Sequence, residues 1–206
     1  MRDLISHIRL FWVYHKNMDS KDLFKQALNQ ATWVVNTSQP SHFDNTTPCA
    51  DWNCRALLNH MLYELAWVDD LIAGRTVSEV GKAYDGDLLK DDHHGNWHAT
   101  AHKAMDAVKK ADPNKVVHLS YADVPAERYI KEIAGDLLIH GWDLAQALQY
   151  SLLFEPQAAQ ALYVAIVPRK KEYAASGLFG APLEVPQDAR LQTKILAMVG
   201  RREPAI

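Results

Sequence analysis

The chain has 206 residues, of which 48% are hydrophobic and 23% are charged, and its formal net charge is −3. This composition indicates a globular protein with one large domain and excludes a disordered chain or a basic nucleic-acid-binding chain. No apolar run is long enough to cross a bilayer, so we expect no membrane partner. The chain has two cysteines, Cys49 and Cys54, which argues against a disulfide framework and favours a reducing, cytoplasmic location.

The first 17 residues are predicted to be an extension that precedes the folded domain. Residues 4–14 are partly apolar, but Arg9 interrupts them and no cleavage site of small residues follows, so they do not match a signal peptide. Met18 stands directly before the first helical pattern and is an alternative start of translation. We therefore predict an N-terminal extension over residues 1–17 and a single domain over residues 18–206.

Two helices are predicted in the first third of the chain. Asp19 or Ser20 can cap the first helix, and apolar residues then recur at helical spacing until Val35. Residues 36–48 are rich in turn formers and end this helix. Asn53 is the expected N-cap of the second helix, whose apolar stripe continues until Gly74 provides a stop.

The middle of the chain contains two more helical patterns. Residues 76–95 are polar and acidic and predict a loop with a short helical piece. A helix follows over about residues 95–111, and Pro113 ends it. Residues 116–121 are rich in β-formers and predict either a strand or an extended loop, and a long helical pattern then covers about residues 126–150.

The C-terminal part is predicted to be less regular. A fifth helical stretch starts near Pro156 and is interrupted by Pro168. Residues 177–186 are turn-rich and extended, and residues 191–199 predict a short closing helix. Three or four long helices joined by connections of unequal length predict an all-α bundle with at least one crossover.

The fourth predicted helix carries a carboxylate and an imidazole, Asp136 and His140, in an otherwise apolar stretch. Residues four apart lie on the same face of a helix, one turn apart. An unpaired charge is costly to bury, and a divalent metal is a partner that binds both a carboxylate and a neutral imidazole. His60 occupies an equally apolar stretch of the second helix. Together the three residues form a candidate metal site with two histidines and one carboxylate.

Ordinary interpretations of these residues stay open. His60 alone is typical of a core histidine that is bonded to a backbone carbonyl. Asp136 alone could pair with Arg128 or Lys131, which precede it on the same helix. In a bundle without metal, His60, Asp136 and His140 would simply form hydrogen bonds with one another.

Two carboxylates stand close to the candidate ligands in the sequence. Glu64, one turn after His60, is a candidate fourth ligand or general base, with an ordinary surface glutamate as the alternative. Asp143, nearly one turn after His140, is a candidate for orienting the imidazole, with an ordinary hydrogen bond within the bundle as the alternative.

Two other groups are predicted to lie outside the site. His94, His98 and His102 follow one another at helical spacing, and His98 and His102 could chelate a metal, but their polar neighbours favour a solvated helix face. Only His98 is kept as a candidate to reach the bundle core. No histidine or lysine that would activate a thiol is visible next to Cys49 or Cys54, so both cysteines are interpreted as structural.

Several segments of the chain resemble one known family. The resemblance is to the DinB-like superfamily, and more closely to the metal-binding domain of mycothiol-dependent maleylpyruvate isomerase and its short relatives. It covers nearly the whole chain after Met18. The segments that carry it are Thr47-Pro-Cys-Ala-Asp-Trp-Asn-Cys-Arg-Ala-Leu-Leu-Asn-His60, Asp136-Leu-Leu-Ile-His140-Gly-Trp-Asp-Leu-Ala-Gln-Ala, Phe179-Gly-Ala-Pro-Leu-Glu-Val-Pro and Leu196-Ala-Met-Val-Gly-Arg.

This resemblance implies an up-down-down-up four-helix bundle that holds a divalent metal, usually zinc or nickel. The implied ligands are His60, Asp136 and His140, with water or a low-molecular-weight thiol at the open positions. In the characterised relatives the metal is thought to activate such a thiol as thiolate, which agrees with the effect of metals on thiols. The characterised isomerase has a glutamate at the position of Asp136, so the shorter side chain would either bring the metal closer to the fourth helix or hold it weakly.

We therefore predict a divalent-metal-binding helical protein that acts as a metal-dependent thiol S-transferase or thiol-dependent isomerase. Its partners would be a small-molecule thiol or electrophile. Two alternatives stay open: a non-catalytic metal-binding stress or interaction module, and a metal-dependent hydrolase that uses the same site with Glu64. A homodimer through an exposed helix face is also open.

Overall fold

The computed structural model describes residues 18–175, 177 and 179–204. The predicted extension over residues 1–17 lies outside the described residues. The described part of the chain is mostly helical, as predicted, and adds a small two-stranded sheet that the all-α prediction did not include. Among the described residues, no helix combines the length and the apolar composition that a membrane crossing requires.

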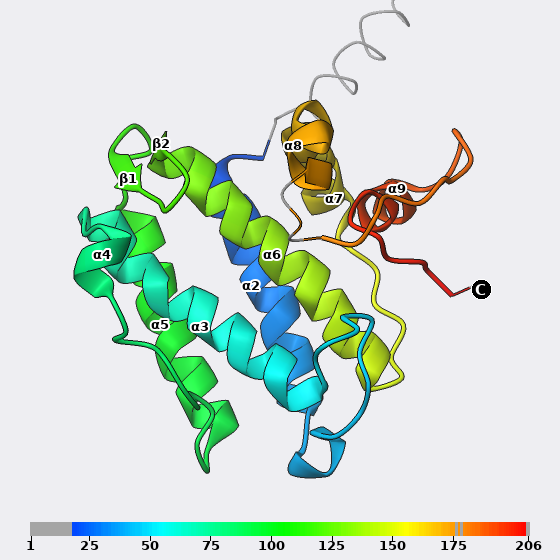
Figure 1. The fold of residues 1–206 in the computed structure, drawn as a ribbon, viewed down its shortest axis with the longest axis horizontal. Coiled ribbons are helices and arrows are strands. Elements are labelled where there is room, and N and C mark those ends of the chain that lie inside the picture. Colours follow the sequence, from blue (N-terminus) through cyan, green and yellow to red (C-terminus); the bar gives the residue numbers. More distant parts are fainter. Residues whose placement is uncertain (1–17, 176, 178, 205–206) are drawn as a thin grey trace, which may run out of the picture.

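Four long helices form the main body of the structure (Figure 1). They are α2 (Ser20–Thr37), α3 (Cys54–Ala73), α5 (His93–Lys110) and α6 (Ala126–Ala147). Helix α2 packs against α5 and α6, and α3 packs against the same two helices. Each helix contributes an apolar stripe to a common core, whose largest fully buried side chains include Trp97, Phe24, Leu23, Leu57, Leu58 and Met61.

The helix ends follow from their capping residues. Asp19 caps α2 and Asn53 caps α3, as predicted, because each side chain accepts a hydrogen bond from a backbone N–H three residues later. Gly74 ends α3 with a φ of 100°, a left-handed conformation that glycine adopts without strain. Helix α5 starts two residues earlier than predicted because Asp92 caps it. Helix α6 ends at Ala147, three residues before the predicted end.

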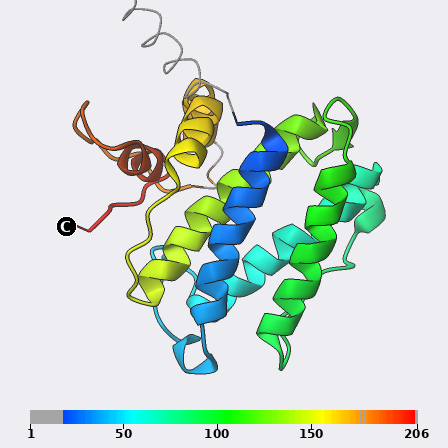
Figure 2. The ribbon, with the colours of Figure 1, turned by 180° about the vertical axis from the view of Figure 1, so that it is seen from behind.

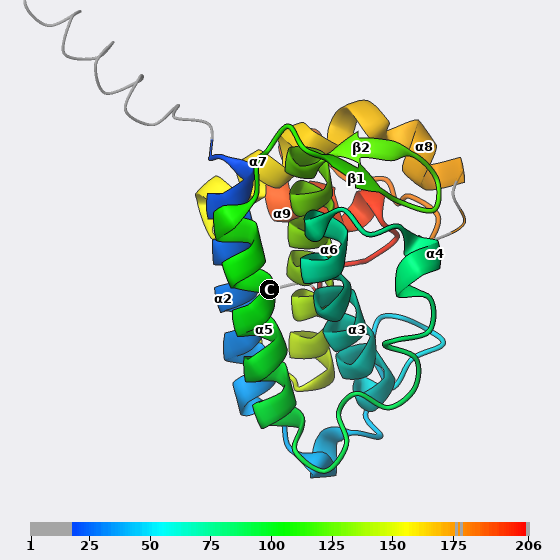
Figure 3. The same cartoon turned by 90° about the vertical axis from the view of Figure 1, so that its left-hand side faces the viewer.

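A hairpin connects α5 to α6. Strands β1 (Val116–His118) and β2 (Asp123–Pro125) pair antiparallel, with Val117 opposite Val124. The sequence predicted either a strand or an extended loop for residues 116–121. Residues 116–118 form a strand, because β2 pairs with them. The hairpin packs against α3 and α6 at one end of the long helices (Figure 3). The short helix α4 (Val77–Val80) lies in the acidic loop, as predicted.

The C-terminal part forms a layer beside α2 and α6, away from α3 and α5 (Figure 2). It consists of α7 (Pro156–Ile166), the 3-10 helix η2 (Val167–Arg169), α8 (Lys170–Ala175) and α9 (Leu191–Met198). Helix α7 packs against α2, α6 and α9. Pro168 interrupts the helical stretch as predicted, because proline lacks the N–H that a helix interior needs.

Candidate metal centre

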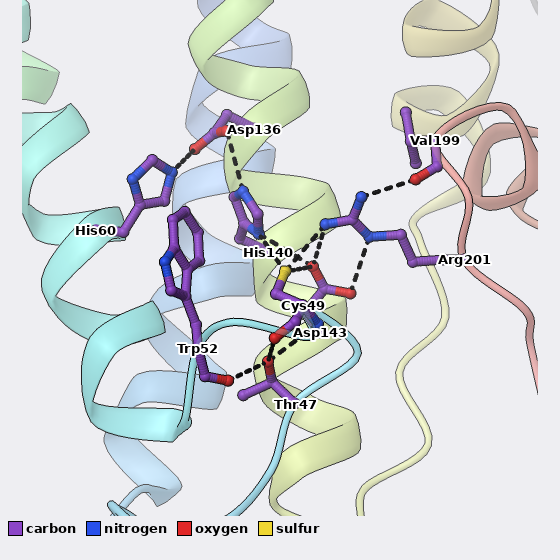
Figure 4. Close-up of polar contacts among 9 residues, drawn as sticks. All are labelled: Thr47, Cys49, Trp52, His60, Asp136, His140, Asp143, Val199 and Arg201. Atoms are coloured by element: carbon purple, nitrogen blue, oxygen red, sulfur yellow. Dashed lines mark hydrogen bonds and ion pairs between the residues drawn. The ribbon is translucent and has the colours of Figure 1, made fainter. Parts of the chain in front are cut away.

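Helices α3 and α6 bring the three predicted ligands together (Figure 4). His60 Nε2 lies 3.8 Å from Asp136 Oδ2, and His140 Nε2 lies 3.4 Å from Asp136 Oδ1. One ligand atom from each side chain lies within 4.8 Å of the other two. Ligand atoms that sit about 2.1 Å from a zinc ion are roughly 3.0–3.4 Å apart, so the observed spacing needs only small side-chain adjustments to hold a metal.

One oxygen of Asp136 has no hydrogen-bond partner among the residues that the structure describes. Its Oδ2 is buried, yet no group in the described part of the chain forms a hydrogen bond with it. The distance of 3.8 Å to His60 Nε2 is longer than a hydrogen bond. A buried carboxylate oxygen without a partner is costly, and one carboxylate with two imidazoles is a typical donor set for zinc or nickel. The three residues therefore fit a divalent metal.

Asp143 contacts His140 on the side of the ring away from Asp136, a contact that fits both interpretations of Asp143 from the sequence. His140 Nδ1 lies 3.0 Å from Asp143 Oδ2, and the side chain of Asp143 is fully buried. This contact places a proton on Nδ1, which donates to the carboxylate, and leaves Nε2 for the ligand set. Burial by itself lowers the pKa of His140, but the carboxylates of Asp136 and Asp143 outweigh it and raise the pKa well above its usual value.

The charged side chains of the site also shift the pKa values of Asp136 and Glu64. Burial raises the pKa of Asp136, but His140 and His60 outweigh this effect and hold it well below its usual range. Glu64 Oε1 lies 4.0 Å from His60 Nδ1 with its side chain 30% exposed, so Glu64 borders the site and is not an ordinary surface glutamate. Burial, reinforced by the negative charge of Asp136, raises the pKa of Glu64 to about 7. A carboxyl group with this pKa can take and return a proton near neutrality.

Trp52 lies against the candidate ligands and was missed by the sequence reasoning. Its ring centroid lies 4.5 Å from that of His60 and 5.8 Å from that of His140. The hydroxyl of Thr47 holds the loop in place, because it donates to the Trp52 carbonyl at 2.8 Å and accepts from the Cys49 N–H at 3.0 Å. The Thr-Pro-Cys-x-x-Trp segment that carried the family resemblance was the signal that could have found it.

Cys49 lies beside His140, which the sequence did not indicate. Its Sγ lies 3.1 Å from Asp143 Oδ2, 3.7 Å from His140 Nδ1 and 3.0 Å from a terminal nitrogen of Arg201. These partners are 94, 91 and 152 positions away in the sequence, so no local pattern indicated them. Cys54 differs, because it is fully buried and burial raises the pKa of its thiol to about 11, which agrees with a structural role.

The histidines of α5 lie outside the site. His94 Nε2 lies 3.0 Å from the carbonyl oxygen of Val35, and His98 Nε2 lies 2.9 Å from Asn36 Oδ1. His98 and His102 are exposed, as predicted for a solvated helix face, whereas His94 is half-buried. The idea that His98 reaches the core is wrong, because its ring bonds to the end of α2 at the surface.

A sequence profile of the mycothiol maleylpyruvate isomerase N-terminal domain matches residues 24–145, which is more than half of the chain. The chain belongs to this family. The family domain is a DinB-like superfamily domain, as predicted. The match contains His60, Asp136 and His140 and ends within α6, so the C-terminal layer and Arg201 lie beyond it. No curated protein and no solved structure matches the chain significantly.

Proposed function

We propose that the protein binds one divalent metal ion, zinc or nickel, through His60, Asp136 and His140. The observation that carries the proposal is the convergence of the three side chains around a buried Asp136 oxygen that lacks a hydrogen bond within the described residues. The family match supports it, because the DinB-like resemblance implies a metal-binding domain. In this proposal residues 18–206 form a single domain, and the four long helices have the up-down-down-up order of a DinB-like bundle.

The proposed activity is the transfer or isomerisation of a small electrophile with the help of a low-molecular-weight thiol. Three protein ligands leave coordination positions open, and a bound divalent metal favours the thiolate form of a thiol. The chain's own residues supply orientation, because Asp143 fixes the ring of His140 and Trp52 covers the ring of His60. Glu64 borders the ligands, with Oε1 4.0 Å from His60 Nδ1, so its carboxylate is placed to accept the proton of a bound thiol.

A metal-dependent hydrolase is the second candidate, and the environment of Glu64 favours it. A carboxylate 4.0 Å from a ligand imidazole is placed to act as general base on a metal-activated water, which suits hydrolysis of an ester or amide. In that case Glu64→Gln would abolish hydrolysis and leave metal binding intact. A protein that keeps its metal and shows neither activity would instead be the non-catalytic binding module.

Metal content measured by elemental mass spectrometry on tag-free protein tests the metal site. We expect about one zinc or nickel ion per chain in the parent protein and none in a His60→Ala, His140→Ala variant. The matched control is His98→Ala, His102→Ala, which removes two exposed histidines one helical turn apart and should keep the metal. Metal content near zero in the parent protein, even after reconstitution, would refute the site.

Thiol use is tested with cobalt-loaded protein. A low-molecular-weight thiol that binds the metal should add a thiolate-to-metal charge-transfer band to the absorption spectrum. The band should persist in Cys49→Ser, because the sulfur comes from solution. If thiols leave the spectrum unchanged and no thiol adduct forms with electrophiles, the transferase and isomerase proposals fail.

A further inference from the structure

A second group of metal-binding side chains lies on the other side of His140. Ligand atoms of Cys49, His140 and Asp143 all lie within 4.8 Å of one another. A thiolate, an imidazole and a carboxylate form a donor set suited to zinc and to cobalt. His140 therefore belongs to two possible ligand sets, through Nε2 on the side of His60 and through Nδ1 on the side of Cys49.

The guanidinium of Arg201 contacts two members of this second ligand set, Cys49 and Asp143 (Figure 4). One terminal nitrogen of Arg201 lies 3.0 Å from Cys49 Sγ and 2.9 Å from Asp143 Oδ2, and its Nε lies 3.3 Å from Asp143 Oδ1. The side chain of Arg201 is only 9% exposed. The guanidinium stays charged at all ordinary pH values, so it is a permanent counterion for Asp143. On the other side of His140, no lysine or arginine of the described residues pairs with Asp136.

The backbone turn at the end of α9 positions Arg201 next to Cys49 and Asp143. Gly200 has a φ of 80°, and the N–H of Arg201 then donates to the Leu196 carbonyl at 2.8 Å, which closes the helix end as a Schellman motif. Gly200 also packs on Gly180 so closely that an added Cβ would lie 2.7 Å from its backbone. The second terminal nitrogen of Arg201 donates to the Val199 carbonyl at 2.8 Å. Backbone geometry and the ion pair therefore fix the guanidinium together.

We propose that Arg201 is the resident cation of the Cys49, His140 and Asp143 set and thereby directs the metal to the His60 side. This inference rests on the proposed metal site. Because the guanidinium contacts both Sγ and Oδ2, a metal ion at these atoms would meet a fixed positive charge. The same ion pair holds Asp143 in place as acceptor for the Nδ1 proton of His140, which leaves Nε2 for the metal. Arg201 is thus a positioning residue that acts through Asp143.

Removing the guanidinium opens a latent metal site. In Arg201→Ala the thiol of Cys49, Nδ1 of His140 and the carboxylate of Asp143 face no competing cation. Cobalt then binds the sulfur, which loses its proton to solvent on coordination. Loss of Arg201 also loosens the orientation of His140, and groups that orient a ligand in this way typically change metal affinity by roughly 10- to 100-fold.

Cobalt titrations in buffer without added thiol test the inference. The wild-type protein should bind cobalt without a thiolate-to-metal charge-transfer band, and Arg201→Ala should show that band. The Arg201→Ala, Cys49→Ser variant should lose the band and bind cobalt roughly 10- to 100-fold more weakly than Cys49→Ser alone. The matched control is Arg202→Ala, which removes the neighbouring exposed arginine and should behave like the wild type.

The outcomes separate this inference from the proposed function. A wild-type protein that binds no cobalt refutes the metal site itself. A wild-type band that Cys49→Ser removes would overturn the inference, and so would an Arg201→Ala variant whose spectrum and affinity equal those of the wild type.

Circular dichroism of the metal-free variants establishes which are folded. Arg201→Met, which keeps the length of the side chain, should show the band, whereas Arg201→Lys, which keeps a cation, should not. If no Arg201 variant folds, Cys49→Ser still tests the inference, because a wild-type band that this substitution removes would overturn it.

Discussion

Replacing Asp143 with asparagine should destabilise the metal-free protein by about 3 kcal/mol. The carboxylate of Asp143 is fully buried and is contacted by His140, Arg201 and Cys49. Asparagine keeps the volume and removes the charge, so a guanidinium that is 9% exposed loses its counterion. Breaking a buried ion pair from one side costs about 3–5 kcal/mol. We expect the lower end of this range, because Arg201 keeps its contacts with Cys49 and the Val199 carbonyl.

Thermal unfolding in the presence of a chelator, followed by circular dichroism, measures this loss. A change of about 3 kcal/mol corresponds to a decrease in Tm of roughly 6–12 °C for a chain of this length. The matched control is Asp69→Asn, because Asp69 pairs with Lys103 at 3.2 Å where both side chains are exposed. Such a pair contributes less than about 1 kcal/mol. An effect of Asp143→Asn no larger than that of the control would refute the reasoning.

The ion pair also gives stability a pH dependence of defined sign. Burial raises the pKa of Asp143, but hydrogen bonds from His140 and Arg201, together with the charge of Arg201, outweigh it and lower the pKa below the ordinary value. The folded protein therefore binds fewer protons than the unfolded chain, whose aspartates have a pKa of about 3.9. The contribution is complete above this value and is lost as the pH falls through the folded-state pKa. The stability difference between wild type and Asp143→Asn should accordingly shrink in acid.

Three further predictions concern the loop, the C-terminal turn and protonation. Trp52→Ala should weaken cobalt binding by roughly three- to tenfold in titrations because stacking on a ligand imidazole is lost, whereas the exposed Trp33→Ala should not. Gly200→Ala should cost about 2 kcal/mol or more by calorimetry, because φ is 80° and the new Cβ would meet backbone at 2.7 Å. Gly86→Ala, with a φ of 100° in open space, should cost only about 1 kcal/mol. Cobalt affinity should decrease from about pH 8 to about pH 6, because protons compete for His140, whose pKa is raised, and an affinity independent of pH would contradict this.

The helices were predictable because their causes are local. Asn53 begins α3 through a hydrogen bond from a nearby backbone N–H, and Gly74 ends it through a left-handed backbone conformation. Both effects involve only neighbouring residues. His60, Asp136 and His140 could also be singled out without a structure. A polar side chain within an apolar helical stripe must find a partner, and helical spacing shows which of these side chains share a face.

The surroundings of the ligands depended on the tertiary structure. Cys49 and Arg201 are 152 positions apart and meet only because the loop before α3 and the turn after α9 pack on the same part of α6. No periodic pattern encodes such a contact. The raised pKa of Glu64 comes from burial and from Asp136 on another helix, so the sequence was equally compatible with a surface glutamate.

The sequence by itself determined which side chains are available to hold a metal, because helix periodicity places a residue on a face. Only the tertiary structure decided which nitrogen of His140 faces the ligand set. Nδ1 is bonded to Asp143, and Asp143 is neutralised by Arg201 from the far end of the chain. Protonation and orientation of a buried side chain depend on the charges packed around it, and here distant segments supply those charges.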